Sequence, residues 1–193
     1  MIRGSHIAIA SGGSNSLPLV VSAFFLFLAS QTLFAQQQDE RSVRTAFIYN
    51  LTKYVDWPKA HDGLNICVFS PEAVDHSPID RDLKRVLEGK ASAGRSVHVT
   101  LGLPGIETQR CSIAYFPGSS HDQFHKFKWA ADQPVLTVGE EATFVREGGM
   151  IAFVRSGDSM QIQVNIYAVR AAGLSISSRL LDLAIIVHTK IRG

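Results

Sequence analysis

The sequence predicts an α/β domain in which helices flank a mostly parallel central β-sheet that carries one antiparallel β-hairpin. Strand-like and helix-like segments alternate four times between residues 39 and 144, and this alternation is typical of parallel strands joined by helices. Two strand-like runs follow, Met150–Val154 and Met160–Tyr167, and the short linker between them contains Gly157-Asp158, which predicts the hairpin. Hydrophobic residues make up 46% of the chain and charged residues 19%, so a disordered regulator is excluded.

The first element of this domain is a helix over residues 39–56. Phe47 and Leu51 belong to one apolar face, Asp39 can cap the first turn, and Pro58 enforces the end. Further strands are expected over residues 64–69, 96–101, 111–116 and 134–138, and helical segments over 79–88, 121–131 and 140–144. Residues 89–95 are small and polar and are therefore expected to form a loop.

The last element is predicted to be a helix that begins around Ser177, after Gly173 has ended the preceding turn. Its apolar positions form one helical stripe, Ile176, Leu180, Leu183, Ala184, Val187 and Ile191, and a second stripe begins with Leu181 and Ile185. A helix that is apolar around most of its girth is buried on two sides or has a partner. We favour a central packing helix, with a protein-binding surface as the alternative.

The N-terminus has the features of a secretory signal. The apolar run Leu19–Ala29 follows Arg3 and is about half as long as the roughly 20 residues that a membrane-spanning helix needs. Ala35 and Leu33 suit positions −1 and −3 of a cleavage site before Gln36. We therefore expect a signal peptide over residues 1–35 and a single domain over residues 39–193 outside the cytoplasm. An uncleaved anchor is the alternative.

The chain contains two cysteines, Cys67 and Cys111. Two thiols in an exported domain usually pair, and this bridge would close a loop of about 45 residues, worth roughly 4 kcal/mol on the chain-entropy argument. The alternative is two buried thiols that never meet. The spacing excludes a redox or metal site of the CxxC type.

The search for reactive residues indicates no enzyme, no cofactor and no metal. The formal net charge is +2 and the basic residues form no stripe, which argues against nucleic acid as a partner. No GxSxG elbow and no phosphate-binding loop ending in GK[ST] occur. His121 and His125 have the spacing of two metal ligands on a helix, but without a third ligand nearby a solvated polar face is the better interpretation.

Four segments taken together are more informative about the function than any single motif above. They are Arg44-Thr-Ala-Phe-Ile-Tyr-Asn-Leu-Thr-Lys-Tyr-Val-Asp-Trp-Pro58, Leu64-Asn-Ile-Cys-Val68, Pro134-Val-Leu-Thr-Val-Gly139, and a fourth from Gly148 through Asn165 to Leu181 that closes with Gly-Leu-Ser-Ile-Ser-Ser. In this order the chain resembles the YfiR family of exported bacterial proteins over residues 40–190. The family's cysteines in the first strand and at the start of the third match Cys67 and Cys111, whereas a second pair carried by other members is missing here.

The resemblance implies a periplasmic, non-catalytic repressor. Such proteins bind the periplasmic domain of a membrane-anchored diguanylate cyclase and lower cyclic di-GMP signalling and biofilm formation. A related membrane sensor is an alternative partner, and the formation of a homodimer is left open. Contact with the membrane is expected only through the partner. We expect partner or ligand contacts in the C-terminal segment, at Arg170, Ser175, Ser177, Arg179, Leu181 and Ile185. Ordinary surface pairing is the alternative for the two arginines.

Two other classes of function are alternatives to this one. A periplasmic module that binds a small ligand or cell-wall fragment and acts on another sensor is the first alternative. An enzyme is the weaker one, because no nucleophile with its base is recognisable. If the repressor interpretation holds, loss of the bridge between Cys67 and Cys111 is expected to loosen the sheet and weaken docking.

Overall fold

The computed structural model describes residues 40–57, 63–70, 77–92, 94–101, 110–127, 134–157 and 159–189. The chain divides into two compact units, Met1–Glu40 and Arg41–Gly193, and nearly all described residues belong to the second unit. The expected signal peptide, residues 1–35, lies outside the described residues. None of the helices in the described part is long and apolar enough to cross a membrane.

The second unit is built on an eight-stranded sheet. In spatial order the strands are β10 (Ala184–Val187), β8 (Ser159–Asn165), β7 (Ile151–Ser156), β6 (Leu136–Gly139), β5 (Ile113–Tyr115), β2 (Gly63–Val68), β4 (Arg95–Leu101) and β3 (Ala91–Ser92). The five neighbours from β7 to β4 are mutually parallel. The predicted fold class is therefore confirmed.

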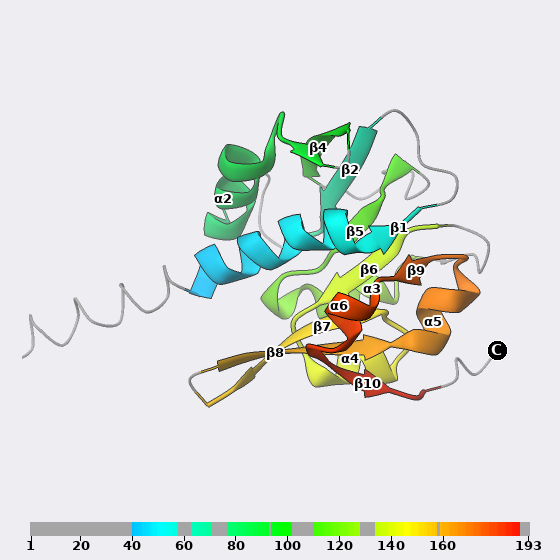
Figure 1. The fold of residues 1–193 in the computed structure, drawn as a ribbon. Coiled ribbons are helices and arrows are strands. Elements are labelled where there is room, and N and C mark those ends of the chain that lie inside the picture. Colours follow the sequence, from blue (N-terminus) through cyan, green and yellow to red (C-terminus); the bar gives the residue numbers. More distant parts are fainter. Residues whose placement is uncertain are drawn as a thin grey trace, which may run out of the picture. The chain divides into compact units, whose positions relative to one another are not determined.

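Helices cover this sheet on two faces (Figure 1). On one face lie the first helix (residues 40–54), α2 (Pro78–Leu87), α5 (Ile166–Ala171) and α6 (Ser178–Leu181). Their buried side chains share one core with alternate strand residues, such as Ile48 with Ile66. The other face carries the turn η2 (Gly118–Ser120), α3 (His121–Phe124) and α4 (Ala142–Arg146), and its smaller core is rich in phenylalanine.

The predicted hairpin is confirmed. Strands β7 and β8 pair antiparallel, with Ile151 opposite Val164 and Ser156 opposite Ser159, and Gly157 in the turn has a φ of 60°. A residue without a Cβ adopts this left-handed conformation at little cost. Strand β7 continues two residues beyond its expected end, to Ser156, because pairing reaches the turn itself. Strand β8 ends at Asn165, two residues before its expected end, because α5 begins at Ile166.

The predicted C-terminal helix is wrong. Within the described residues from Ser177 onward, the helix is limited to Ser178–Leu181, and Ala184–Val187 form the strand β10, which pairs parallel with β8. Three consecutive β-branched residues, Ile185–Val187, favour an extended backbone. In addition, β8 needs hydrogen-bond partners on the side that does not face β7. The apolar stripe of the sequence therefore belongs to a short helix followed by a strand.

The first helix also ends earlier than predicted. It stops at residue 54, and Val55–Asp56 form the strand β1, which pairs antiparallel with β9 (Ser175–Ile176). The next backbone bond runs from the Ser177 N–H to the Tyr54 carbonyl at 2.8 Å. These bonds connect the end of the first helix to the C-terminal segment, a long-range contact that no local pattern indicates.

The position of the Phe144 ring requires glycine at two positions, Gly139 at the end of β6 and Gly149 shortly before β7. A Cβ added to Gly139 would lie 2.5 Å from the Phe144 ring, and one added to Gly149 would lie 2.2 Å from it. The ring is fully buried, so it has no room to move aside. Gly149 thus allows the close approach of an aromatic ring.

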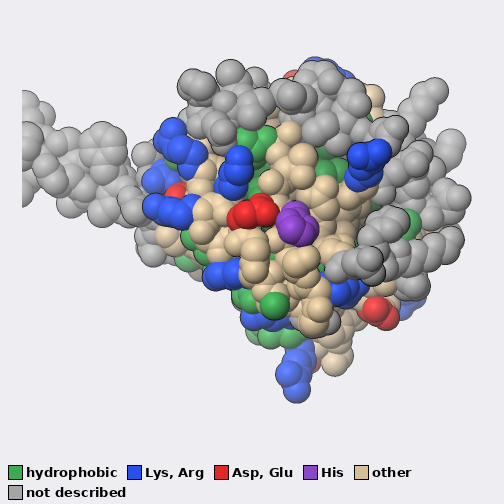
Figure 2. Space-filling model, turned by 90° about the horizontal axis from the view of Figure 1, so that it is seen from above, with side chains coloured by type: hydrophobic (Ala, Val, Ile, Leu, Met, Phe, Trp, Pro, Cys, Tyr) green, Lys and Arg blue, Asp and Glu red, His purple; other side chains and the backbone are tan. Residues whose placement is uncertain are grey.

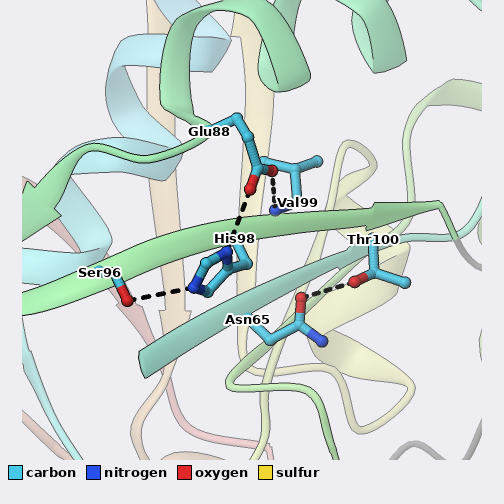
Figure 3. Close-up of polar contacts among 6 residues, drawn as sticks. All are labelled: Asn65, Glu88, Ser96, His98, Val99 and Thr100. Atoms are coloured by element: carbon cyan, nitrogen blue, oxygen red, sulfur yellow. Dashed lines mark hydrogen bonds and ion pairs between the residues drawn. The ribbon is translucent and has the colours of Figure 1, made fainter. Parts of the chain in front are cut away.

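Beside β4, the Glu88 side chain binds a backbone N–H group of that strand (Figure 3). One oxygen of its carboxylate accepts a hydrogen bond from the Val99 N–H at 2.7 Å, and the other lies 3.1 Å from Nδ1 of His98. Strand β3, which was expected to be loop, pairs antiparallel with the start of β4. The Glu88 carboxylate and strand β3 both occupy backbone groups of β4 that could otherwise pair with a strand of another chain.

The pKa of Glu88 is lowered, chiefly by the hydrogen bond from the Val99 backbone, against an opposing effect of burial. Because the folded pKa lies below the unfolded one, the carboxylate stabilises the fold above the unfolded pKa, and this contribution is lost as pH falls through the folded pKa. We expect Glu88→Gln to lower the melting temperature at neutral pH, and the difference from the wild type to shrink as the pH falls through the acid range. Thermal melts of both proteins across the acid range test this, and an equal difference at all pH values would contradict it.

Candidate functional site

The C-terminal residues expected to contact a partner lie along one continuous stretch, from α5 through β9 and α6 to β10. Arg170 in α5 and Arg179 in α6 are exposed, as is Ser175 in β9. Ile185 in β10 is 47% exposed. These four positions are therefore open to another molecule.

The other two positions are less available. Leu181 is half-buried and packs against the larger core. The Ser177 hydroxyl is buried, and within the described residues it has no hydrogen-bond partner although Ser177 precedes α6. The structure therefore gives Leu181 a packing role and places the Ser177 hydroxyl beneath the surface.

Three large hydrophobic side chains are exposed among the described residues, Tyr167, Leu183 and Ile185. Leu183, in the turn before β10, is 75% exposed, and Tyr167 meets His188 edge to face with ring centroids 5.8 Å apart. All three belong to the segment from α5 to the residues just after β10. Since β10 is the last strand of the sheet, these side chains border a strand edge that the described residues leave uncovered.

A second cluster is buried at the carboxyl ends of two neighbouring parallel strands. Tyr115 is the last residue of β5, and Glu140 follows directly after β6. Oε1 of Glu140 accepts a hydrogen bond from the Tyr115 hydroxyl and lies 3.4 Å from Nε of Arg44 in the first helix. Oε2 accepts from the Gly118 N–H at 2.9 Å. Both carboxylate oxygens are thus engaged.

Burial determines the protonation state of the Tyr115 hydroxyl. Tyr115 is fully buried, and burial, followed by the charge and hydrogen bond of Glu140, raises the pKa of its hydroxyl well above the ordinary value. The hydroxyl therefore stays protonated and acts as a donor. The Arg44 and Glu140 side chains are 22% and 10% exposed, so their opposite charges interact with little screening by water.

The position of the cluster is where open α/β sheets bind ligands. Numbered along the chain, the strands β4-β2-β5-β6-β7 have the spatial order 2-1-3-4-5, and in such sheets ligands bind outside the carboxyl ends of the strands. Here, however, the Glu140 carboxylate accepts a hydrogen bond from the phenol and forms an ion pair with the guanidinium. This arrangement fastens the first helix to the sheet, and it offers no nucleophile beside a base.

Sequence reasoning missed this cluster. The helical segment expected over residues 140–144 would place both Glu140 and Glu141 in its first turn, but α4 starts at Ala142, and Glu141 is exposed. A usable signal existed, since Glu140 follows a strand that is apolar apart from Thr137, a place where polar residues of parallel sheets converge. Arg44 could not be found in this way, because its distance to Glu140 depends on how the first helix crosses the sheet.

The predicted disulfide is confirmed. The sulfur atoms of Cys67 and Cys111 are 1.99 Å apart and their Cα atoms 5.7 Å. The bridge lies in the smaller core, where Cys67 is fully buried. Among the residues that the structure describes, no three His, Cys, Asp or Glu side chains come together as metal ligands, and Nε2 of His125 lies 2.8 Å from Glu147.

Comparison with known families gives one result. The sequence pattern of the family described as YfiR/HmsC-like matches residues 41–185. This range includes the buried cluster, both cysteines and the segment from α5 to β10 as far as Ile185. A comparison with curated proteins gave no match.

Proposed function

The chain belongs to the YfiR/HmsC-like family, and from this membership we propose that it is a periplasmic, non-enzymatic regulator of a membrane-anchored diguanylate cyclase. The observation that carries the proposal is the extent of the family match, residues 41–185, which is nearly the whole described domain. In this role the signal peptide over residues 1–35 directs the single domain, residues 39–193, to the periplasm. Binding to the cyclase's outer domain represses cyclic di-GMP synthesis and thereby biofilm formation.

The exposed C-terminal segment is the docking surface in this proposal. Tyr167, Leu183 and Ile185 supply apolar area, and an apolar centre that loses its water on contact is the usual source of binding energy in an interface. Arg170 and Arg179 are exposed in the same segment and suit bidentate contacts with carboxylates of a partner.

The direct test of the function is the level of cyclic di-GMP in cells that lack the gene. Deletion is expected to raise cyclic di-GMP, and expression of the full chain with its N-terminal signal is expected to lower it again. The cyclase should co-purify with the full chain from solubilised membranes. Unchanged cyclic di-GMP, together with no cyclase in the purified material, would refute the proposal.

The docking surface is tested by Leu183→Asp. The leucine is 75% exposed, so the substitution should leave the melting temperature nearly unchanged, whereas a charge placed in an apolar contact should weaken binding to the cyclase by about tenfold or more. Ala91→Asp is the matched control, because Ala91 is an exposed strand residue at the opposite edge of the sheet. Surface-based binding measurements with both variants decide the point. Equal affinities would place the interface elsewhere.

A further inference from the structure

A cavity lies between the first helix and α2. The cavity measures about 220 Å³. An apolar cavity of about 150 Å³ holds a benzene molecule, so this one can take a benzene-sized ring with a substituent. The first helix contributes Thr45 and Tyr49, and α2 contributes Val86 and Leu87.

The surface of the cavity is largely apolar, and the aromatic ring that lines it, that of Tyr49, has a fixed orientation. The Tyr49 hydroxyl donates a hydrogen bond to the Ala91 carbonyl at 3.0 Å, which orients the ring. Val86 packs against the larger core beside the buried Leu87. A compact apolar or aromatic body therefore fits the cavity better than a strongly polar one.

The charged side chains around the cavity are positive on balance. Arg85 and Lys90 line it, together with one acid, Asp82. The Asp82 carboxylate already accepts hydrogen bonds from Arg85 at 2.7 Å and from Arg41 at 3.3 Å. An additional negative charge would consequently be attracted to this site.

Two lysines strengthen this attraction. The Lys53 ammonium lies 4.2 Å and the Lys90 ammonium 5.1 Å from the centre of the Tyr49 ring. Within the part of the chain that the structure describes, neither lysine has a carboxylate partner. Two like charges near one ring repel each other, and an anion bound beside them would relieve this repulsion. Figure 2 shows lysine and arginine side chains gathered over α2 on the face seen from above.

Thr45 supplies an independent observation. Its side chain lines the cavity, yet its hydroxyl is buried and has no hydrogen-bond partner among the described residues. Leaving such a group without a partner costs about 1–3 kcal/mol. Threonine in a helix has two accessible χ1 rotamers, so a single rotation can turn the hydroxyl toward a polar group of a molecule in the cavity.

We propose that this cavity binds a small organic anion with a compact apolar or aromatic body. Thr45 would provide a hydrogen bond, Tyr49 and Val86 the apolar contacts, and Arg85 and Lys90 the charge. This proposal does not depend on the regulatory role, because it concerns ligand binding by the isolated protein.

The test uses benzoate as an anionic probe, with benzyl alcohol as a neutral and benzylamine as a cationic probe of similar size. Titrations followed by amide chemical shifts should show benzoate perturbing residues 42–49 and 82–90. Benzyl alcohol should bind about tenfold more weakly, since a hydrogen bond to a charged group is stronger than one to a neutral group by that order. Benzylamine should not bind. Shift changes confined to other segments, equal affinity for all three probes, or no binding of benzoate would overturn the proposal.

Four variants separate the contributions. Arg85→Gln combined with Lys90→Gln should weaken benzoate about tenfold and leave benzyl alcohol unchanged, whereas Arg81→Gln, an exposed change in α2 away from the cavity lining, should affect neither. Thr45→Val should raise the melting temperature without ligand, because it removes an unpartnered hydroxyl, and should weaken benzoate several-fold. Thr45→Ser keeps the hydroxyl and should retain affinity. Unchanged benzoate affinity in both Thr45→Val and the double variant would refute these assignments.

Discussion

Replacing both Cys67 and Cys111 with alanine is expected to lower the free energy of unfolding by about 4 kcal/mol. The two residues are separated by 44 positions, and the loss of that crosslink restores conformational freedom to the unfolded chain. For a domain of this size the melting temperature should fall by roughly 10–15 °C. Thermal and denaturant unfolding of the oxidised wild type and the double variant measure the effect.

A reductant provides the control for this prediction. Reduced wild type should melt close to the double variant, and the double variant should not respond to the reductant. A change below about 1 kcal/mol would show that the bridge contributes little, through strain or a compact unfolded state. Because Cys67 is fully buried, reduction should require partial opening of the domain.

The same double variant tests the link between the disulfide and docking. In the order of strands, β2 and β5 are separated from β10 by β6, β7 and β8. We therefore expect the weaker docking predicted for the variant to follow from the loosened sheet and to appear as the temperature approaches the melting point. Partner affinity that stays at the wild-type value throughout would reject the coupling.

Removing the Glu140 carboxylate is the second change with a large expected effect. In Glu140→Ala, the buried Tyr115 hydroxyl loses its acceptor and the Arg44 guanidinium loses the carboxylate 3.4 Å away. Breaking a largely buried ion pair by deleting one partner leaves the other charge poorly solvated. Allowing for the partial exposure of Arg44, we expect a loss of about 2–4 kcal/mol in denaturant unfolding.

Glu141→Ala is the matched control, since Glu141 is the adjacent acid and is exposed. Its effect should stay within about 0.5 kcal/mol. Adding Arg44→Met to Glu140→Ala should recover part of the lost stability, because it removes the uncompensated charge. Equal effects of the two glutamate variants, or further loss on adding Arg44→Met, would contradict the assigned role of the ion pair.

The parts of the fold that could be predicted are those in which local pattern and tertiary environment agree. The hairpin is one, because the alternation from Met160 onward matches a strand with one buried face and the Gly157 turn suits the connection. The parallel sheet is another, since the alternation of elements leaves few other arrangements. The bridge between Cys67 and Cys111 followed from the cysteine count and the expected compartment.

The predictions were wrong where one sequence pattern is compatible with both a helix and a strand. The run from Ile176 to Val187 has apolar residues at helical spacing, yet β10 forms there because β8 has an edge that can pair with it. Likewise, Val55 continues the apolar face of the first helix but pairs with Ile176 instead. In each case hydrogen bonds to a distant strand outweigh a local preference of less than about 1 kcal/mol per residue.

The amino-acid sequence alone was sufficient to predict the fold class and the pairing of the cysteines, and it carried the resemblance to an exported regulatory family. Only the tertiary structure could bring Arg44 to Glu140, expose Leu183 beside an edge strand, and enclose a cavity behind Thr45. The physical reason is that burial and ion pairing depend on the direction in which a helix crosses a sheet, and that direction results from the packing of the entire core.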